Sequence, residues 1–199
     1  MGVHIDSYKE RDHLIELCFA CYVERGIENI TDNDFCSAAN LNPDMLYSYF
    51  KDKDEILFEC VRYGYNRLEN AMFDVVDNCF MEEMYSKLIE VCNTLSAELK
   101  FMYYAFSKRD YTNKRLGKKQ VTYKQVYEFL KSNSFYDTFG EKIACRLGCP
   151  YDVILVSVHD FLTFMTNYGL WGGDALSDSS IARFNNILND AAEYKKQLI

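Results

Sequence analysis

The sequence predicts an all-α fold of about nine helices, and two observations support this class. Apolar residues recur at the three- and four-residue spacing of a helix face through most of the 199 residues. The chain contains only two prolines, Pro43 and Pro150, and so few helix breakers favour long helices. Hydrophobic residues make up 49% and aromatic residues 16% of the chain, which is enough to bury a large core. We expect two parts: a small head, residues 1–53, and a larger body, residues 54–199.

The first helix is expected over about residues 7–25, which carry apolar side chains on one face and charges on the other. Gly26 then ends this helix as a C-cap. Cys18 and Cys21 form a CxxC pair, but they lie on the apolar face, which favours core packing over redox chemistry or metal binding. Since no second CxxC and no nearby pair of histidines completes a zinc site, we expect no metal.

A second, short helix is expected over residues 32–39. The hydroxyl of Thr31 can cap it, and Phe35 and Cys36 fall on its inward face. Asn40 follows at a position that requires the left-handed backbone conformation, which asparagine tolerates better than most non-glycine residues.

A third helix, residues 43–50, is expected to begin with Asn42 as its cap and with a proline at its first position, where a missing N–H costs nothing. Asp52 can cap a fourth helix, with Glu55 three residues later completing a capping box. This fourth helix continues to about Phe80. Two short helices joined by a tight turn and braced by a longer one form a helix-turn-helix.

Three segments of the head carry the strongest signal in the chain: GIENIT at 26–31, FCSAANLN at 35–42 and LYSYFKDKDEIL at 46–57. In this order they resemble the signature of the TetR family of transcriptional regulators. The likeness covers about residues 10–60 and departs from the family at Asn40, where glycine is usual, and at Asn42 and Asp52, where serine is common. Each departure keeps the backbone or capping chemistry, so the resemblance still implies the family's fold.

The resemblance implies a head that places residues 43–49 in a major groove of double-stranded DNA. By this resemblance, four residues match positions that hold phosphates: Thr31, Tyr47, Tyr49 and Lys53. Four others match the exposed start of the recognition helix, which faces base edges: Asn42, Pro43, Asp44 and Met45. Asp44 either accepts a hydrogen bond from a cytosine amino group or only complements the helix dipole, and both interpretations stay open.

The net charge of −8 runs against this assignment, because an acidic chain is not drawn to nucleic acid as a whole. Residues 1–53 hold five basic and ten acidic side chains, a net charge of −5. DNA binding then requires the few cations of the head to converge at the edges of the motif, with modest affinity and a shallow salt dependence. These cations are Lys9, Arg11, Lys51 and Lys53. The alternative is a TetR-like co-activator or partner-binding protein whose acidic head does not bind DNA.

The body is expected to be helical throughout. Residues 82–108 predict one long helix or two abutting ones, and further helices are expected over residues 116–130, 135–147, 152–170 and 178–197. Residues 152–170 are apolar on nearly every side, so one face should meet the chain's own core and another a partner. We expect a homodimer in which the last two helices of each chain form a four-helix bundle.

His159 and Asp160 are neighbours within residues 152–170, but adjacent helical residues point about 100° apart. A core or ligand-contacting histidine is therefore favoured over a catalytic one. Phosphate-binding glycine loops, nucleophile elbows and HExxH motifs are absent from the sequence, so we expect neither an enzyme nor a cofactor. The polar start of the chain and its longest apolar stretch, 153–158, predict no export signal and no membrane span, hence a cytoplasmic protein.

Bodies of the resembled family usually enclose a small-molecule effector. A cavity is therefore expected near Tyr103, Phe106, Tyr127, Phe161, Met165 and Tyr168. These side chains suit an apolar or aromatic inducer, and the alternative is a filled core. The expected protein is a repressor that the inducer releases from a near-palindromic operator, through a fourth helix that spans ~40 Å at ~1.5 Å per residue. The basic run at 108–124 predicts a solvated face, with an acidic ligand or partner as the lesser alternative.

Overall fold

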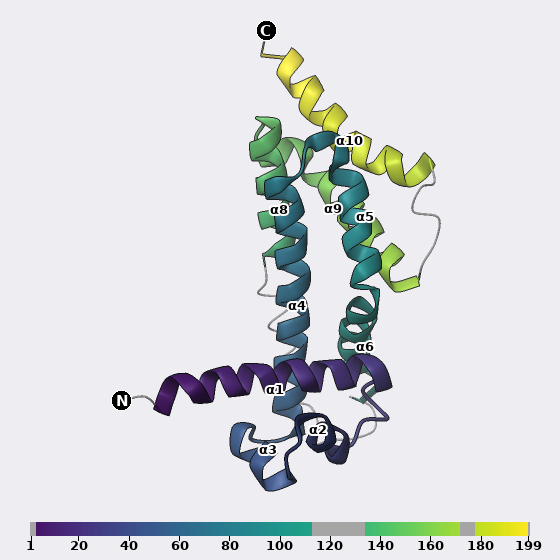
Figure 1. Ribbon diagram of the computed structural model, residues 1–199. Coiled ribbons are helices and arrows are strands. Elements are labelled where there is room, and N and C mark those ends of the chain that lie inside the picture. Colours follow the sequence, from purple (N-terminus) through teal and green to yellow (C-terminus); the bar gives the residue numbers. More distant parts are fainter. Residues whose placement is uncertain (1–2, 113–133, 172–177, 199) are drawn as a thin grey trace. The chain divides into compact units, whose positions relative to one another are not determined.

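The computed structural model describes residues 3–112, 134–171 and 178–198, and this part of the chain contains nine helices and no strand (Figure 1). They are α1 (Val3–Arg25), α2 (Asp32–Ala39), α3 (Pro43–Tyr49), α4 (Lys53–Asn78), α5 (Met81–Thr94), α6 (Ser96–Thr112), α8 (Phe135–Leu147), α9 (Tyr151–Trp171) and α10 (Asp178–Lys196). The all-α prediction is confirmed, and residues 82–108 fall in two abutting helices, α5 and α6. The helix expected over residues 116–130 lies outside the described residues. None of the described helices combines the length and the apolar character needed to cross a membrane.

The chain divides into two compact units. The first contains α1, α2, α3, the part of α4 up to Arg67, and α6 from Lys100 onward. The second contains the rest of α4, the helix α5, the start of α6, and α8 to α10. Both α4 and α6 therefore contribute residues to each unit. The division into a DNA-binding head and a ligand-binding body at residue 53 stays a prediction.

Aromatic rings around α1 form the core of the first unit. The ring centroid of Tyr22 lies 5.1 Å from that of Phe35 in α2 and 5.5 Å from that of Phe101 in α6. Phe19, almost one turn earlier, meets Phe101 edge to face at 5.4 Å. Both cysteines of the CxxC pair are buried, as predicted, and burial raises the pKa of the Cys18 thiol to about 12.

The predicted caps at the ends of α1, α2 and α3 are present in the structure. Gly26 (φ 78°) and Asn40 (φ 53°) both adopt the left-handed conformation, which most L-residues avoid. Asn42 caps α3 by accepting a hydrogen bond from the backbone N–H of Met45 at 2.9 Å, and Pro43 occupies the first helical position.

The capping box predicted at the start of α4 forms only in part. Asp52 Oδ1 accepts from the backbone N–H of Glu55 at 2.8 Å, as expected. Glu55 Oε2 accepts from the backbone N–H of Lys51 at 2.6 Å instead of returning to Asp52. The other oxygen of Glu55 pairs with Arg11 at 2.9 Å. This carboxylate therefore connects α4 to α1 and also accepts a backbone hydrogen bond at the start of α4.

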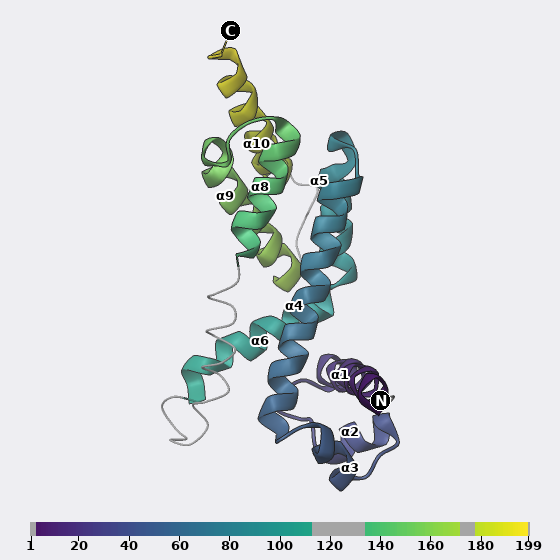
Figure 2. The same ribbon diagram turned by 90° about the vertical axis from the view of Figure 1, so that its left-hand side faces the viewer.

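In the second unit, α8, α9 and α10 lie side by side (Figure 2), and α5 packs against α9. Phe161 of α9 is fully buried, with its ring 6.3 Å from that of Tyr85 in α5 and 5.3 Å from that of Phe184 in α10. Arg146 of α8 donates to the carbonyl of Cys79 at 2.6 Å. This bond satisfies an acceptor that the end of α4 leaves without an intrahelical partner.

The last helices agree with the sequence prediction on the core side of α9 and depart from it at the end of α10. The inner face of α9 is buried, and apolar side chains remain exposed elsewhere on the helix, since Val156 is 79% exposed and Leu155 37% exposed. The expected contact of this second apolar face with a partner stays a prediction. The sequence also places Leu198 at the end of the apolar stripe of the last helix, but in the structure Ile187 is fully buried and Leu198 is 68% exposed, so the inward position of Leu198 is wrong. The reason is that α10 ends at Lys196, and Leu198 lies beyond its last turn.

His159 is exposed, so of the two roles expected for it the core position is wrong, and the ligand contact stays a prediction. The inward positions of α9 at this level belong to Val158, Phe161 and Leu162, which are buried. The imidazole of His159 lies instead 5.3 Å from the ring of Tyr136, on the α8 side.

Gly64 of α4 allows α1 to approach closely, which yields a first prediction. A Cβ at this position would lie 2.7 Å from Cε2 of Phe19, whose ring is held between Tyr63 and Phe101. Gly64→Ala should therefore lower the free energy of unfolding by about 1–3 kcal/mol, as overpacking does, although alanine is the better helix former. Urea denaturation followed by circular dichroism measures the change. In a Phe19→Leu background the loss should shrink, and an equal loss in both backgrounds would refute the ring contact as its cause.

Candidate nucleic-acid interface

One face of helix α3 packs on the rest of the first unit, and the first residues of the helix are exposed to solvent. Leu46 and Phe50 are buried, whereas Asn42, Asp44 and Met45 are exposed. The exposed side chains surround the N-terminal turn, where backbone N–H groups have no intrahelical acceptor. A short helix with an anchored back and an exposed first turn has the geometry of a recognition helix.

The turn between α2 and α3 fixes this orientation. The N–H of Leu41 donates to the carbonyl of Cys36 at 2.9 Å, and that of Asn40 to Ser37 at 3.4 Å, so the end of α2 is closed by a left-handed cap. Asn42 then caps α3 through its Oδ1. That bond leaves the side-chain NH2 group of Asn42 available as a donor to a partner.

Thr31 lies at the N-terminus of α2, as predicted, and is tied to Asp34. Its backbone N–H and its hydroxyl both donate to Asp34 Oδ2, each at 2.7 Å. The hydroxyl bond, followed by the backbone bond, lowers the pKa of Asp34, and Arg25 pairs with the same carboxylate. An acid three residues after a threonine is a variant of the capping-box spacing, so the sequence held a signal for Asp34 that went unused.

Lys53 belongs to the same corner of the head. Its Nζ donates to the carbonyl of Ile30 at 2.5 Å. With Ile30, Thr31, Asp32 and Asn33 it lines an open depression of about 430 Å³ at the N-terminus of α2. A lysine ammonium beside the N–H groups of a helix N-terminus suits a phosphate oxygen. Two of the predicted phosphate contacts, Thr31 and Lys53, therefore lie together.

Tyr47 and Tyr49 bond with carboxylates of the head. The hydroxyl of Tyr49 donates to Glu10 Oε2 at 2.6 Å, and the hydroxyl of Tyr47 bonds with Asp32. Burial, followed by the effect of Asp32, raises the pKa of Tyr47 to about 12. A hydroxyl has a single proton to donate, so in this conformation neither tyrosine has one for a phosphate.

Arg11 does not join the lysines of the head at the outer edge of the motif, and this part of the expected convergence is wrong. Its Nη2 pairs with Glu55 Oε1 at 2.9 Å and with Glu59 Oε1 at 3.2 Å, and its Nε donates to the carbonyl of Tyr49 at 3.4 Å. Buried and half-buried carboxylates attract the guanidinium inward. The head therefore offers DNA fewer cations than its sequence suggests.

The residues expected to line an effector cavity belong to different units. Tyr103, in the first unit, is 36% exposed, whereas Phe161 and Met165 are buried in the second. Outside the described residues lie the side chains of Phe106 and Tyr168 and all of Tyr127. The cavity stays a prediction.

Two solved structures resemble the chain over nearly its whole length. One, assigned to the TetR family of transcriptional regulators and from Mesorhizobium loti MAFF303099, is 15% identical, covers 94% of this chain and 96% of its own, and has a TM-score of 0.55. The other, assigned as a transcriptional regulator and from Rhodococcus sp. RHA1, is 14% identical over 92% of this chain and 95% of its own, with a TM-score of 0.60. No protein-family model and no curated protein matches the chain. The chain thus has the fold of TetR-family regulators.

The cap of α3 gives a second prediction. Asn42→Ala removes the acceptor for the Met45 N–H, so we expect the first turn of α3 to fray and the free energy of unfolding to fall by about 0.5–2 kcal/mol. Hydrogen exchange of the Met45 amide, followed by NMR, should accelerate. Asn42→Ser keeps a cap acceptor and should restore most of the protection. Unchanged exchange in Asn42→Ala would show that the cap does not hold this turn.

Proposed function

We propose that the chain is a DNA-binding transcriptional regulator whose head inserts residues 43–49 into a major groove. The observation that supports this most is the construction of α3, a short helix with an exposed, capped first turn and a buried back. Asn42 and Asp44 then face base edges, where an amide NH2 donates to acceptors and a carboxylate accepts from a cytosine amino group. Met45, which is 49% exposed, offers an apolar contact to a thymine methyl group.

Backbone contacts flank this helix in the proposed complex. Thr31 and Lys53 bind a phosphate at the depression beside the N-terminus of α2. Tyr47 and Tyr49 reach phosphates only when their hydroxyls leave Asp32 and Glu10. DNA binding therefore includes an exchange of hydrogen bonds within the head, which limits the affinity gained from each contact.

A second candidate keeps the fold and replaces DNA with a protein partner, as in a co-activator. The head's net charge of −5 over residues 1–53 favours this partner-binding candidate. The ion pairs of Arg11 with Glu55 and Glu59 also favour it, because they keep this cation away from the outer surface. The candidates differ in their response to salt, because a DNA complex that neutralises phosphates weakens steeply as salt rises.

The proposed regulator is a homodimer formed through α9 and α10. These helices pack on each other within the chain, and apolar side chains remain on their outer surface: Leu155, Val156 and Ile181. A second copy that brings the same helices together covers these groups in a four-helix bundle. Two heads related by a two-fold axis then read a near-palindromic operator.

The proposed switch is a small apolar or aromatic inducer bound in the body, which releases a repressor from its operator. Helix α4 contributes residues to both units, and its 26 residues correspond to a length of about 39 Å. An inducer that displaces this helix changes the spacing of the heads. Couplings of this kind are typically ~1–3 kcal/mol, enough to change operator occupancy several-fold.

Fluorescence anisotropy with duplexes from around the chain's own gene tests DNA binding and gives a third prediction. Lys53→Ala should weaken binding to all duplexes alike and lower the slope of log affinity against log salt by about one. Asn42→Ala should instead change the order of preference among duplexes. Lys87→Ala removes the same charge from an exposed position on α5 and should leave binding unchanged.

Two outcomes would oppose the DNA-binding proposal. One is the absence of any duplex bound more tightly than random sequence at physiological salt. The other is equal loss of affinity from Lys53→Ala and Lys87→Ala, since general charge would then account for binding. Either result would leave the partner-binding candidate in place.

The dimer gives a fourth prediction. Val156→Asp places a charge on the exposed apolar face of α9 and should convert the dimer to a monomer, measured by light scattering at micromolar concentration. Phe80→Asp is the matched control, because Phe80 is 75% exposed at the start of α5 and outside the proposed interface. A wild-type chain that is monomeric at this concentration would contradict the proposed assembly.

A further inference from the structure

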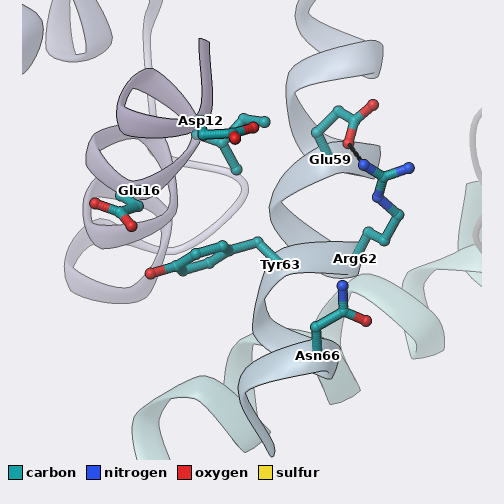
Figure 3. Close-up of a pocket in the computed structure, with 7 residues that line it drawn as sticks. Asp12, Glu16, Glu59, Arg62, Tyr63 and Asn66 are labelled. Atoms are coloured by element: carbon teal, nitrogen blue, oxygen red, sulfur yellow. Dashed lines mark ion pairs between the residues drawn. The ribbon is translucent and has the colours of Figure 1, made fainter. Parts of the chain in front are cut away.

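A pocket separate from the proposed DNA-binding surface lies between α1 and α4 in the first unit (Figure 3). Its volume is about 280 Å³, near the lower end of the range for small-molecule sites, ~300–1,000 Å³. It is lined by Asp12, Ile15 and Glu16 of α1 and by Glu59, Arg62, Tyr63 and Asn66 of α4. Figure 3 shows Tyr63 reaching from α4 toward Glu16 on α1.

Glu59 is the feature of this pocket that points to a ligand. It is 9% exposed, and its Oε1 accepts from Arg11 at 3.2 Å. Its Oε2 is buried and accepts no hydrogen bond among the described residues. Arg62 Nη2 forms an ion pair with Oε2 at 3.1 Å, but not in the geometry of a hydrogen bond. A buried carboxylate oxygen without a donor is costly, so a donor placed in the pocket would stabilise it.

The charges around Glu59 decide the sign of that donor. The lining itself holds three carboxylates, those of Asp12, Glu16 and Glu59, and one guanidinium, that of Arg62, an excess of two negative charges. Beyond the lining, the guanidinium of Arg67 lies 5.8 Å from the centroid of the Tyr63 ring. Counting Arg11 together with Glu55, its other partner, leaves this excess unchanged. This excess favours a cation as the occupant.

The walls of the pocket favour an organic cation. The ring of Tyr63 packs edge to face on Phe19 at 5.2 Å, and its hydroxyl bonds with Glu16, so this side chain is a fixed aromatic wall. Ile15 adds an apolar surface, and Asn66 adds an amide. Within the described residues, no three His, Cys, Asp or Glu side chains gather closely enough to hold a metal ion.

We propose that this pocket binds a small organic cation with a primary ammonium or guanidinium group, which donates to Glu59 Oε2 and lies between the α1 carboxylates and the Tyr63 ring. The methylene groups of the cation pack on Ile15 and on the ring, and its charge neutralises the excess of Asp12 and Glu16.

Binding of a cation at this site would also affect the contacts that hold α3. Glu59 shares Arg11 with the carbonyl of Tyr49, the last residue of α3, so a new partner for Glu59 alters the bonds that hold the recognition helix. This consequence rests on the proposed DNA-binding function, whereas the cation site itself does not.

Isothermal titration of the full chain with 1,4-diaminobutane and with agmatine tests the site and gives a fifth prediction. We expect saturable binding of one cation per chain, and none of 1,4-butanediol, which has nearly the same shape without charge. Glu59→Gln should weaken binding about tenfold or more, the equivalent of one charge-assisted hydrogen bond. Glu82→Gln removes a charge from an exposed position of α5 and should bind as the wild type does.

Uptake that never saturates, or equal binding by Glu59→Gln and wild type, would overturn the site, because general attraction to an acidic protein explains both. If circular dichroism shows that Glu59→Gln does not fold, Asp12→Asn and Asn66→Ala serve in its place, since both positions are exposed and line the pocket. Each should weaken the binding of diaminobutane several-fold, and wild-type affinity in both would also overturn the site. Failure here leaves the anisotropy measurements of DNA binding unaffected.

Discussion

The guanidinium of Arg11 joins three helices of the first unit, α1, α3 and α4. From α1 it pairs with Glu55 and Glu59 of α4, donates to the carbonyl of Tyr49 at the end of α3, and lies 5.1 Å from the centroid of the Phe50 ring. These bonds are partly buried and charge-assisted, so they fix direction as well as distance. Without Arg11, Glu59 would be a buried charge that lacks its α1 partner. Together with the α2–α3 turn and the buried Leu46 and Phe50, this side chain holds the orientation of α3.

The same arrangement bears on how an acidic head could act in the proposed DNA binding. Arg11 and Arg25 neutralise carboxylates within the unit and do not contribute to a positive outer face. In the proposed DNA complex, phosphate attraction is left to Lys53, to the exposed Lys9 and Lys51, and to helix N-termini. Recognition in that complex would depend on short-range hydrogen bonds that match a particular sequence more than on long-range attraction, which favours selectivity over affinity.

The features that could be predicted from the sequence are those that involve neighbours along the chain. Gly26 and Asn40 adopt the left-handed conformation, and Asn42 caps α3, because each role requires a residue type at a fixed short spacing. The bonds from Arg11 to Glu59 and from Tyr49 to Glu10 join residues 48 and 39 positions apart. Such pairings depend on how helices pack, and helical periodicity does not specify them.

The same limit applies to the outer helices. Periodicity predicts the apolar character of α9, but which of its faces stays uncovered depends on neighbours far along the chain. Leu198 continues the apolar stripe of the last helix, and His159 lies within a mostly apolar helix, yet both are exposed. The packing of α9 leaves His159 outside, and Leu198 lies beyond the end of α10. In the proposed interface, the position of Lys53 beside Thr31 likewise required the tertiary structure.

Each unit contains a buried thiol whose reactivity depends on local unfolding of that unit. Cys18 in the first unit and Cys92 in the second are held by burial at pKa values of about 12, so their reactive thiolate forms are scarce at neutral pH while the cores stay closed. Alkylation of either thiol therefore proceeds through transient opening of the unit that contains it, whereas the exposed Cys145 reacts without such opening. Modification at the two buried thiols would then be slow, and its rates would report local unfolding separately for the two units of one chain, without any added label.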